Sequence, residues 1–144
     1  MVDGEESSYE PGVLLDAGAD IMPNGMTHCP HSGHPDPGCY NVPRQVAYAG
    51  FSGALYRREF IDTCGGLDLE MVDGDQWADV ELSLRAWQQG WEVWCVPQSR
   101  IICCDEVELQ DSDRIALNRD HVLAKYDGFW QHIARMTTSV VPRY

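Results

Sequence analysis

The stretch DVELSLRAWQQGWEVWCVP, from Asp79 to Pro97, predicts a helix followed directly by a strand. Three apolar side chains fall on one helical face: Val80, Leu84 and Trp87. Glu81 and Arg85 are four residues apart and can therefore pair on another face. Asp79 can cap the helix N-terminus. These features predict a helix by themselves, and they leave open whether its polar residues also form a site.

The residues on either side of this stretch predict further strands, loops and helices. Gly90 can end the helix, residues 91–96 then read as a strand, and Pro97 stops that strand or marks an edge. Residues 12–21 read as a strand or a strand pair, residues 23–43 as a loop, and RREFIDTC (57–64) as a short helix. A last helix begins near Ser112. The order of these elements predicts an α/β layered domain.

The composition is that of one ordinary domain. The chain has 144 residues, of which 44% are hydrophobic, enough for a core. We expect a disordered N-terminus over residues 1–11, a single domain over 12–136 and a tail over 137–144. No apolar run is long enough for a membrane span and no secretion signal is visible, so we expect a cytoplasmic protein.

The chain is strongly acidic, with a formal net charge of −13. Such a charge disfavours nucleic acid as a partner, because the phosphate backbone would be repelled. The charge is consistent with simple solubility. The alternative is a functional acidic face, such as one that holds a cation near a sugar phosphate.

Six cysteines are present, and we expect most of them to be reduced. The segment HCPHSGHPDPGC places mixed histidine and cysteine side chains in a short loop: His28, Cys29, His31, His34 and Cys39. Such ligands suit zinc, although the spacing fits no standard finger. A plain polar loop is the competing interpretation.

An ordered series of motifs resembles the C-terminal half of family-2 glycosyltransferases with the GT-A fold. The series is SGALYRREF, GGLDLE, ADVELSLR, GWEV and PQSRIIC, with LLDAGADIMPNG and DPGCYNVPRQV upstream and LNRDHVLAKY downstream. ELSLRAWQQG is also similar to the mucin-type GalNAc-transferases, which share that fold. The resemblance covers about residues 12 to 126. It implies the C-terminal portion of a GT-A fold, with a mixed sheet and packed helices.

The resemblance also implies an inverting transfer from a nucleotide-sugar donor to a glycan or lipid-linked acceptor. In the family a carboxylate takes the acceptor proton, and that base corresponds to Asp79. The implied substrate-binding residues are Ser52, Gly53, Asp68, Trp77 and Glu81. Aromatic faces stack on sugars, and Trp77 is the best candidate for that contact, whereas Trp91 and Trp94 are expected in the core.

Two departures from the family pattern concern individual side chains. Ala78 replaces the glutamate that usually precedes the base, and Cys103 replaces a histidine that can reach the metal. Thiolate is a poor ligand for Mg²⁺ or Mn²⁺. A divalent cation is therefore expected only together with a donor-binding half, which the 144 residues do not show. We expect that half on a partner chain, or a homo-oligomer that covers an unpaired edge strand.

Purely structural roles for the same residues are the competing interpretation. Asp79 would then be only a helix cap, and Glu81 with Arg85 only a surface pair contributing ~0.3–0.5 kcal/mol. The basic residues Arg119, His121 and Lys125 predict either a contact with a diphosphate or lipid headgroup, or a solvated helix face. A non-catalytic module that binds glycan or a partner is the alternative function.

Overall fold

The computed structural model describes residues 13–71, 77–102 and 112–138. The described part contains four α-helices: α1 (Arg58–Cys64), α2 (Ala78–Gln88), α3 (Ser112–Lys125) and α4 (Phe129–Thr138). A 3-10 turn, η1, spans Phe51–Gly53. The strands are short: β1 (Val13–Leu14), β2 (Asp20–Ile21), β3 (Thr27–His28), β4 (His34–Pro35), β5 (Arg44–Gln45) and β6 (Trp94–Cys95). The α/β class is confirmed.

The strands form three antiparallel pairs, β1 with β4, β2 with β3 and β5 with β6. A hydrogen bond from the Val46 N–H to the Val93 carbonyl, at 3.0 Å, extends the β5–β6 pair by one residue. The N–H groups of Ala47 and Tyr48 both donate to the Ala19 carbonyl, at 3.0 and 3.4 Å, and join the segment after β5 to the residue before β2. The expectation of a mixed sheet is wrong for the described residues, whose strand pairs are all antiparallel. The strand expected over residues 91–96 is reduced to β6, because its paired partner β5 has only two residues.

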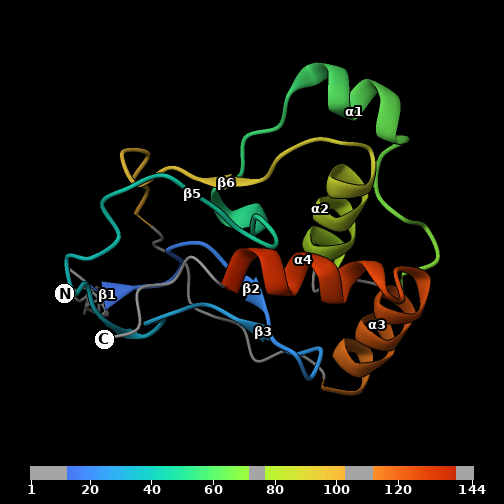
Figure 1. The fold of residues 1–144 in the computed structure, drawn as a ribbon, viewed down its shortest axis with the longest axis horizontal. Helices are drawn as coiled ribbons and strands as arrows, with labels where there is room; N and C mark the ends of the chain where they lie inside the picture. Colours follow the sequence, from blue (N-terminus) through green and yellow to red (C-terminus); the bar gives the residue numbers. More distant parts are fainter. Residues whose placement is uncertain (1–12, 72–76, 103–111, 139–144) are drawn as a thin grey trace, which may run out of the picture.

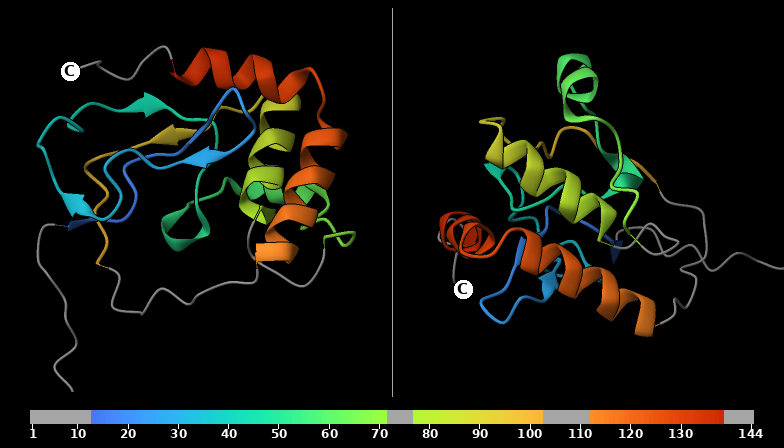
Figure 2. Two further views of the ribbon diagram at one scale, coloured as in Figure 1. Left: turned by 90° about the horizontal axis from the view of Figure 1, so that it is seen from below. Right: turned by 90° about the vertical axis from the view of Figure 1, so that its right-hand side faces the viewer.

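Helices α2, α3 and α4 gather at one end of the molecule and the strand pairs at the other (Figures 1 and 2). α4 crosses β2, and α1 stands apart on the far side of α2. The main core lies between α4, α2 and the Ala19–Ile21 and Ala47–Tyr48 segments. A smaller core lies between α1 and α2 and is made of Phe60, Cys64, Leu82 and Ala86. α2 is therefore buried from two sides.

Residues with a positive φ lie at the ends of several helices. α1 ends at Gly65, which has a left-handed φ of 83°, as the sequence predicts. Gly128, with φ 78°, divides the expected last helix into α3 and α4. Asp79 is not the cap of α2: the cap position is Trp77, with φ 73° and no side-chain cap bond. Burial of the Trp77 indole in the main core accompanies this uncommon backbone conformation.

Several boundary expectations meet the structure only in part. α4 continues two residues past the expected domain end, and Thr137 is fully buried. The rest of the expected tail, like the expected disordered N-terminus, lies outside the described residues. Cys29, Cys39, Cys64 and Cys95 are free thiols, which agrees with reduced cysteines for this part of the chain. Within the described residues no helix has the length and apolar character needed to cross a bilayer.

Candidate functional site

Asp79 lies in the first turn of α2, beside Gly50 of the segment that precedes η1. Its Oδ1 accepts a hydrogen bond from the Val80 N–H at 2.8 Å. A Cβ atom added to Gly50 would lie 3.9 Å from Asp79 Oδ2 and 3.1 Å from Asp16 Oδ2. Two carboxylates thus face one stretch of backbone that has no side chain. The N-terminal turn of a helix also favours negative charge, which suits a carboxylate at this position.

Ser52 and Gly53 follow Gly50 directly and form the exposed turn η1. A Cβ on Gly53 would come within 2.7 Å of Ile101 Cδ1, so a side chain at this position would require the exposed Ile101 side chain to move. The structure therefore brings the segment that carries Ser52 and Gly53 next to the carboxylate of Asp79.

Two tyrosines lie within electrostatic reach of Asp79. Burial and, to a smaller extent, the Asp79 charge together raise the pKa of Tyr56 to about 12. The pKa of Tyr48 is also raised, mainly by burial and then by Cys29 and Asp79. Both phenols remain protonated near neutral pH. They can therefore act as hydrogen-bond donors beside the carboxylate.

Glu81 occupies a different environment, because its side chain is almost completely buried. Its Oε1 accepts hydrogen bonds from the Tyr126 hydroxyl at 2.8 Å and from Lys125 Nζ at 3.0 Å. Its Oε2 accepts a hydrogen bond from Arg85, whose guanidinium also donates to the Cys64 carbonyl at 2.6 Å. The expected pair with Arg85 forms, but in the interior rather than at the surface.

A carboxylate with no exposed surface cannot contact the sugar acceptor of a transfer reaction directly. The expected substrate contact of Glu81 is therefore replaced by a structural role in this arrangement. The ion pairs with Arg85 and Lys125 raise the pKa values of both bases against the effect of their burial. Glu81 ties α2 to the end of α3.

Asp68 belongs to the same network. Its Oδ2 accepts hydrogen bonds from Lys125 Nζ at 2.7 Å and from His121 Nε2 at 3.2 Å. These contacts, led by the one to Lys125, hold the pKa of Asp68 well below its usual range. The expected headgroup site on α3 is thus occupied in part by carboxylates of the protein itself. Arg119 of the same set pairs with Asp120 at 2.8 Å.

Asp68, Glu70 and His121 bring three metal-ligating atoms within 4.8 Å of one another. Carboxylate oxygen and imidazole nitrogen are suitable ligands for Mn²⁺ or Zn²⁺. However, the Lys125 ammonium lies 2.7 Å from Asp68 Oδ2, the carboxylate oxygen that also contacts His121. Two cations on one oxygen repel each other, so the residues fit a metal only if Lys125 moves away. Asp68, Glu70 and His121 are therefore a candidate metal-binding group in which Lys125 competes with the ion for Asp68.

Two of the three tryptophans with an expected position, Trp77 and Trp94, do not lie where the sequence predicts. Trp77, the expected sugar-stacking residue, is only 5% exposed and packs in the main core. Trp94, expected in the core, is 48% exposed, and its indole donates to Glu92 Oε2 at 2.9 Å. The two expectations fail for different reasons: the Trp77 indole is buried at a position with a positive φ, whereas Trp94 lies on β6, which pairs only with β5 among the described strands. Trp91 packs against the smaller core, as expected.

The candidate zinc loop does not assemble. Among the described residues, His28, His31, His34 and Cys39 form no group with metal-ligating atoms close together. Instead His31 Nδ1 lies 2.6 Å from the Tyr40 hydroxyl, and His34 Nδ1 lies 3.0 Å from the Ser32 carbonyl oxygen. The polar-loop interpretation therefore describes this segment better. Cys103, at the family's histidine position, lies outside the described residues.

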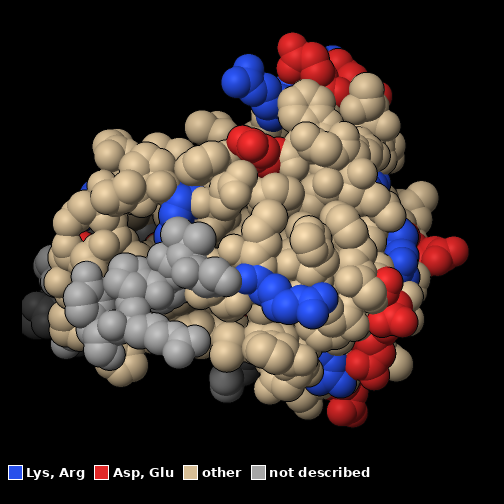
Figure 3. Space-filling view, in the orientation of Figure 1, with Lys and Arg blue, Asp and Glu red and all other residues tan. Residues whose placement is uncertain are grey.

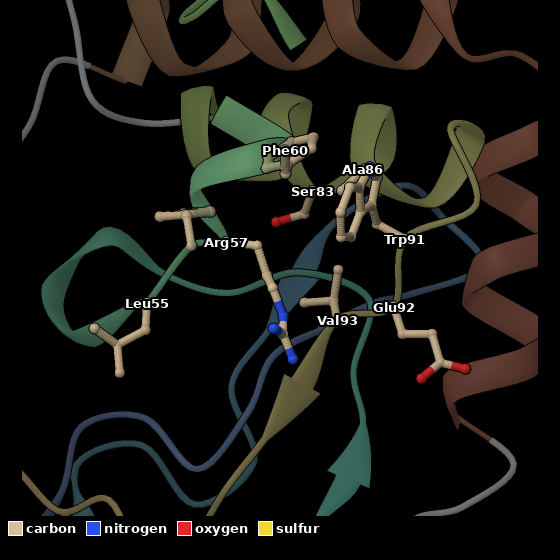
Figure 4. A pocket seen from close by; sticks show the side chains of 9 residues that line it. Leu55, Arg57, Phe60, Ser83, Ala86, Trp91, Glu92 and Val93 are labelled. Carbon is tan, nitrogen blue, oxygen red and sulfur yellow. The ribbon is translucent and has the colours of Figure 1, made fainter. Parts of the chain in front are cut away.

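A shallow hollow opens on α2 on the side of Asp79. It is lined by Tyr56, Phe60, Ser83, Ala86 and Trp91, with Arg57 and Glu92 at its rim (Figure 4). Ser83 is one turn after Asp79 and therefore shares its helical face. Its hydroxyl oxygen accepts a hydrogen bond from the Ala49 N–H at 3.2 Å. The hollow thus continues the face that begins with the candidate base.

Sequence reasoning missed several of these groups. Asp16 was visible only as part of an upstream motif, and nothing in the local pattern placed it beside Gly50. Tyr126 is the last residue of the downstream motif LNRDHVLAKY, and that motif does not indicate its partner. Its contact with Glu81 joins residues 45 positions apart, and a local pattern carries no signal for such a pair. Tyr56 carried no signal of its own.

Comparison of the chain with protein-family models, with curated proteins and with solved structures finds no match in any of the three.

Proposed function

We propose that this chain is a glycosyltransferase-like domain that holds the acceptor side of an inverting sugar transfer. The observation that carries the proposal is the juxtaposition at Gly50. There the partly exposed Asp79 carboxylate faces bare backbone, next to the exposed turn η1. The ordered motif series from residue 12 to residue 126 supports the same function.

In the proposed reaction Asp79 acts as the general base. Its carboxylate takes the proton from an acceptor hydroxyl while that oxygen attacks the anomeric carbon of the donor, and the nucleoside diphosphate leaves. Gly50 and Gly53 allow the sugars to approach the backbone closely. Asp68 and Glu81 act at a distance from the substrate, because their contacts to Lys125 position α2 and the loop before it.

The donor must be held by other groups. The described residues contain no glycine-rich phosphate-binding loop, and the metal-ligating group at Asp68 is shared with an ammonium group. We propose that a donor-binding half elsewhere in the protein, on a partner chain or on a second copy completes the enzyme. The divalent cation, if required, belongs with that half.

A non-catalytic binding module is the second candidate. Ala78 in place of the family's glutamate and the buried Glu81 favour it, because they remove two carboxylates from the acceptor side. Such a module would bind glycan at the same hollow without turnover. The two candidates differ in their dependence on a nucleotide sugar.

The test is a titration of the chain with UDP- and TDP-sugars and Mn²⁺, followed by tryptophan fluorescence and by release of the nucleoside diphosphate. Saturable binding with release of product supports the enzyme. Asp79→Asn should then keep donor binding and lower turnover by about 10²- to 10⁴-fold, the usual contribution of a general base. Asp62→Asn is the matched control, because Asp62 is an exposed carboxylate on α1 that pairs only with Arg58 among the described residues.

The donor titration is repeated in the presence of the cell extract that contains the partners of the chain. If no donor binds in either experiment, the result contradicts the proposed enzyme function and favours the binding module. Turnover that is equal in wild type and Asp79→Asn also contradicts the proposal, since it would assign the base elsewhere.

A further inference from the structure

One of the residues that line the hollow beside α2, Tyr56, has a polar atom with no partner among the described residues. The Tyr56 hydroxyl is buried and finds no hydrogen bond within the described part of the chain. A buried hydroxyl without a partner is unfavourable in a folded protein and calls for an explanation. Its phenol stays protonated, with a pKa of about 12. The group is therefore ready to donate a hydrogen bond.

The surroundings of this hydroxyl combine aromatic faces with polar groups. Tyr56 stacks on Phe60 at a centroid distance of 6.3 Å, and Trp91 meets Phe60 edge-on at 6.0 Å. Trp91 is half-buried, so part of its indole borders the hollow (Figure 4). Ser83 already accepts the Ala49 N–H, which leaves its own O–H as a donor. Apolar faces next to hydroxyl donors suit a ligand that has both apolar C–H faces and many oxygen acceptors.

The charged residues around the hollow indicate the net charge of the ligand. Arg57 and Glu92 stand at the rim with their charged ends directed away from α2 (Figure 4). One is basic and the other acidic, so the rim has no net preference for an anion or a cation. In Figure 3 acidic and basic side chains lie next to each other near α1, with no patch of a single sign there. A neutral ligand is therefore favoured.

We propose that this hollow binds a neutral pyranose ring of the acceptor, with its C–H face on Trp91 and a ring hydroxyl on Tyr56. The inference rests on the proposed function, because it identifies the ring as the sugar next to the one that reacts at Asp79. Ser83 links the two positions, since it lies one turn from Asp79 and lines the hollow. Tyr56 is a binding residue in this assignment and takes no part in proton transfer.

Binding is measured with methyl α-glucoside, methyl α-galactoside and methyl α-mannoside, without any nucleotide. A ligand of that size on a shallow surface should bind with a Kd on the order of 1 mM. The readout is the indole N–H region of the NMR spectrum, where the five tryptophans give separate signals. We expect the Trp91 signal to shift on titration and that of Trp130, on α4, to stay in place.

Tyr56→Phe removes only the hydroxyl and should weaken glycoside binding by about 3- to 10-fold. Because that hydroxyl has no partner in the fold, the variant should melt at the same or a higher temperature than wild type. A purely structural role for Tyr56 predicts no change in glycoside binding. Tyr40→Phe is the matched control, since its hydroxyl pairs with His31 far from the hollow.

Three outcomes overturn the inference: no shift of the Trp91 signal with any glycoside, a shift of Trp130 instead, or equal binding by wild type and Tyr56→Phe. None of these outcomes bears on the proposed function, which is tested separately by donor binding and by Asp79→Asn. Conversely, Tyr56-dependent glycoside binding without donor binding keeps the hollow and assigns the chain to the binding-module class.

Discussion

The buried carboxylate of Glu81 gives the sharpest prediction for stability. Glu81→Gln keeps the size of the side chain and one acceptor oxygen for Tyr126. It removes the charge that Arg85 and Lys125 face. Removing one partner of a buried ion pair costs about 3–5 kcal/mol, because it leaves a charge without compensation. Arg85 is 16% exposed and carries most of this effect, whereas Lys125 is 39% exposed and can turn towards water.

We therefore expect a loss of about 3 kcal/mol in the free energy of unfolding, the lower end of that range. For a chain of this size such a loss lowers the melting temperature by roughly 6–12 °C. Urea unfolding followed by circular dichroism measures the free energy, and calorimetry measures the temperature. Glu70→Gln is the matched control: its carboxylate is 83% exposed, and we expect a change within about 0.5 kcal/mol.

A double-mutant cycle with Arg85→Leu separates the pair from the two single losses. The double variant should be more stable than the sum of the singles by about 0.5–3 kcal/mol, since the charge left alone by one change is removed by the other. A Glu81→Gln loss no larger than that of Glu70→Gln would refute the reasoning. Strict additivity in the cycle would show that Glu81 and Arg85 do not interact.

The remaining predictions concern pH, backbone conformation and assembly. The pKa of Asp68 is depressed, so its contribution to stability is present above the ordinary aspartate pKa of about 3.9 and is lost as the pH falls towards the folded value. The melting temperature should therefore drop more steeply below about pH 4 in wild type than in Asp68→Asn, and parallel curves would contradict this. Gly18→Ala should cost more than about 2 kcal/mol, because φ is +91° and the new Cβ would meet Val46 Cγ1 at 2.6 Å. Gly33→Ala, with φ +76° and open space, should cost about 1 kcal/mol, and equal losses in urea unfolding would remove the steric argument. Short strand pairs with open edges predict a dimer in light scattering at high concentration, and a monodisperse monomer would count against it.

The local sequence was sufficient to predict helix ends where a single residue determines the backbone conformation. Gly65 and Gly128 end or interrupt helices because a left-handed φ suits glycine, and the spacing around Val80 and Leu84 predicts α2 correctly. Strand lengths were not predictable in the same way. The run from residue 91 to residue 96 has strand-forming residues, but a strand extends only as far as its partner does. β5 supplies two paired residues.

The candidate site was predictable in part for a similar reason. An i, i+4 pair of glutamate and arginine reads the same at the surface and in the interior, so the sequence could not show that Glu81 is buried. Its burial depends on Tyr126 and Lys125, which approach from more than forty residues away. The position of Trp77 depends on a positive φ that residue type alone does not indicate.

The geometry of α2 explains why acidic residues two positions apart serve different purposes. Successive residues of an α-helix are about 100° apart around the axis, so Asp79 and Glu81 point in nearly opposite directions. Val80 with Leu84, and Leu82 with Ala86, fill the two apolar faces between them. Because Glu81 is fixed to α3 on one side and both apolar faces are packed, the helix cannot rotate about its axis. Asp79 is therefore held towards Gly50 and the hollow, and the buried ion pair determines where the candidate base points.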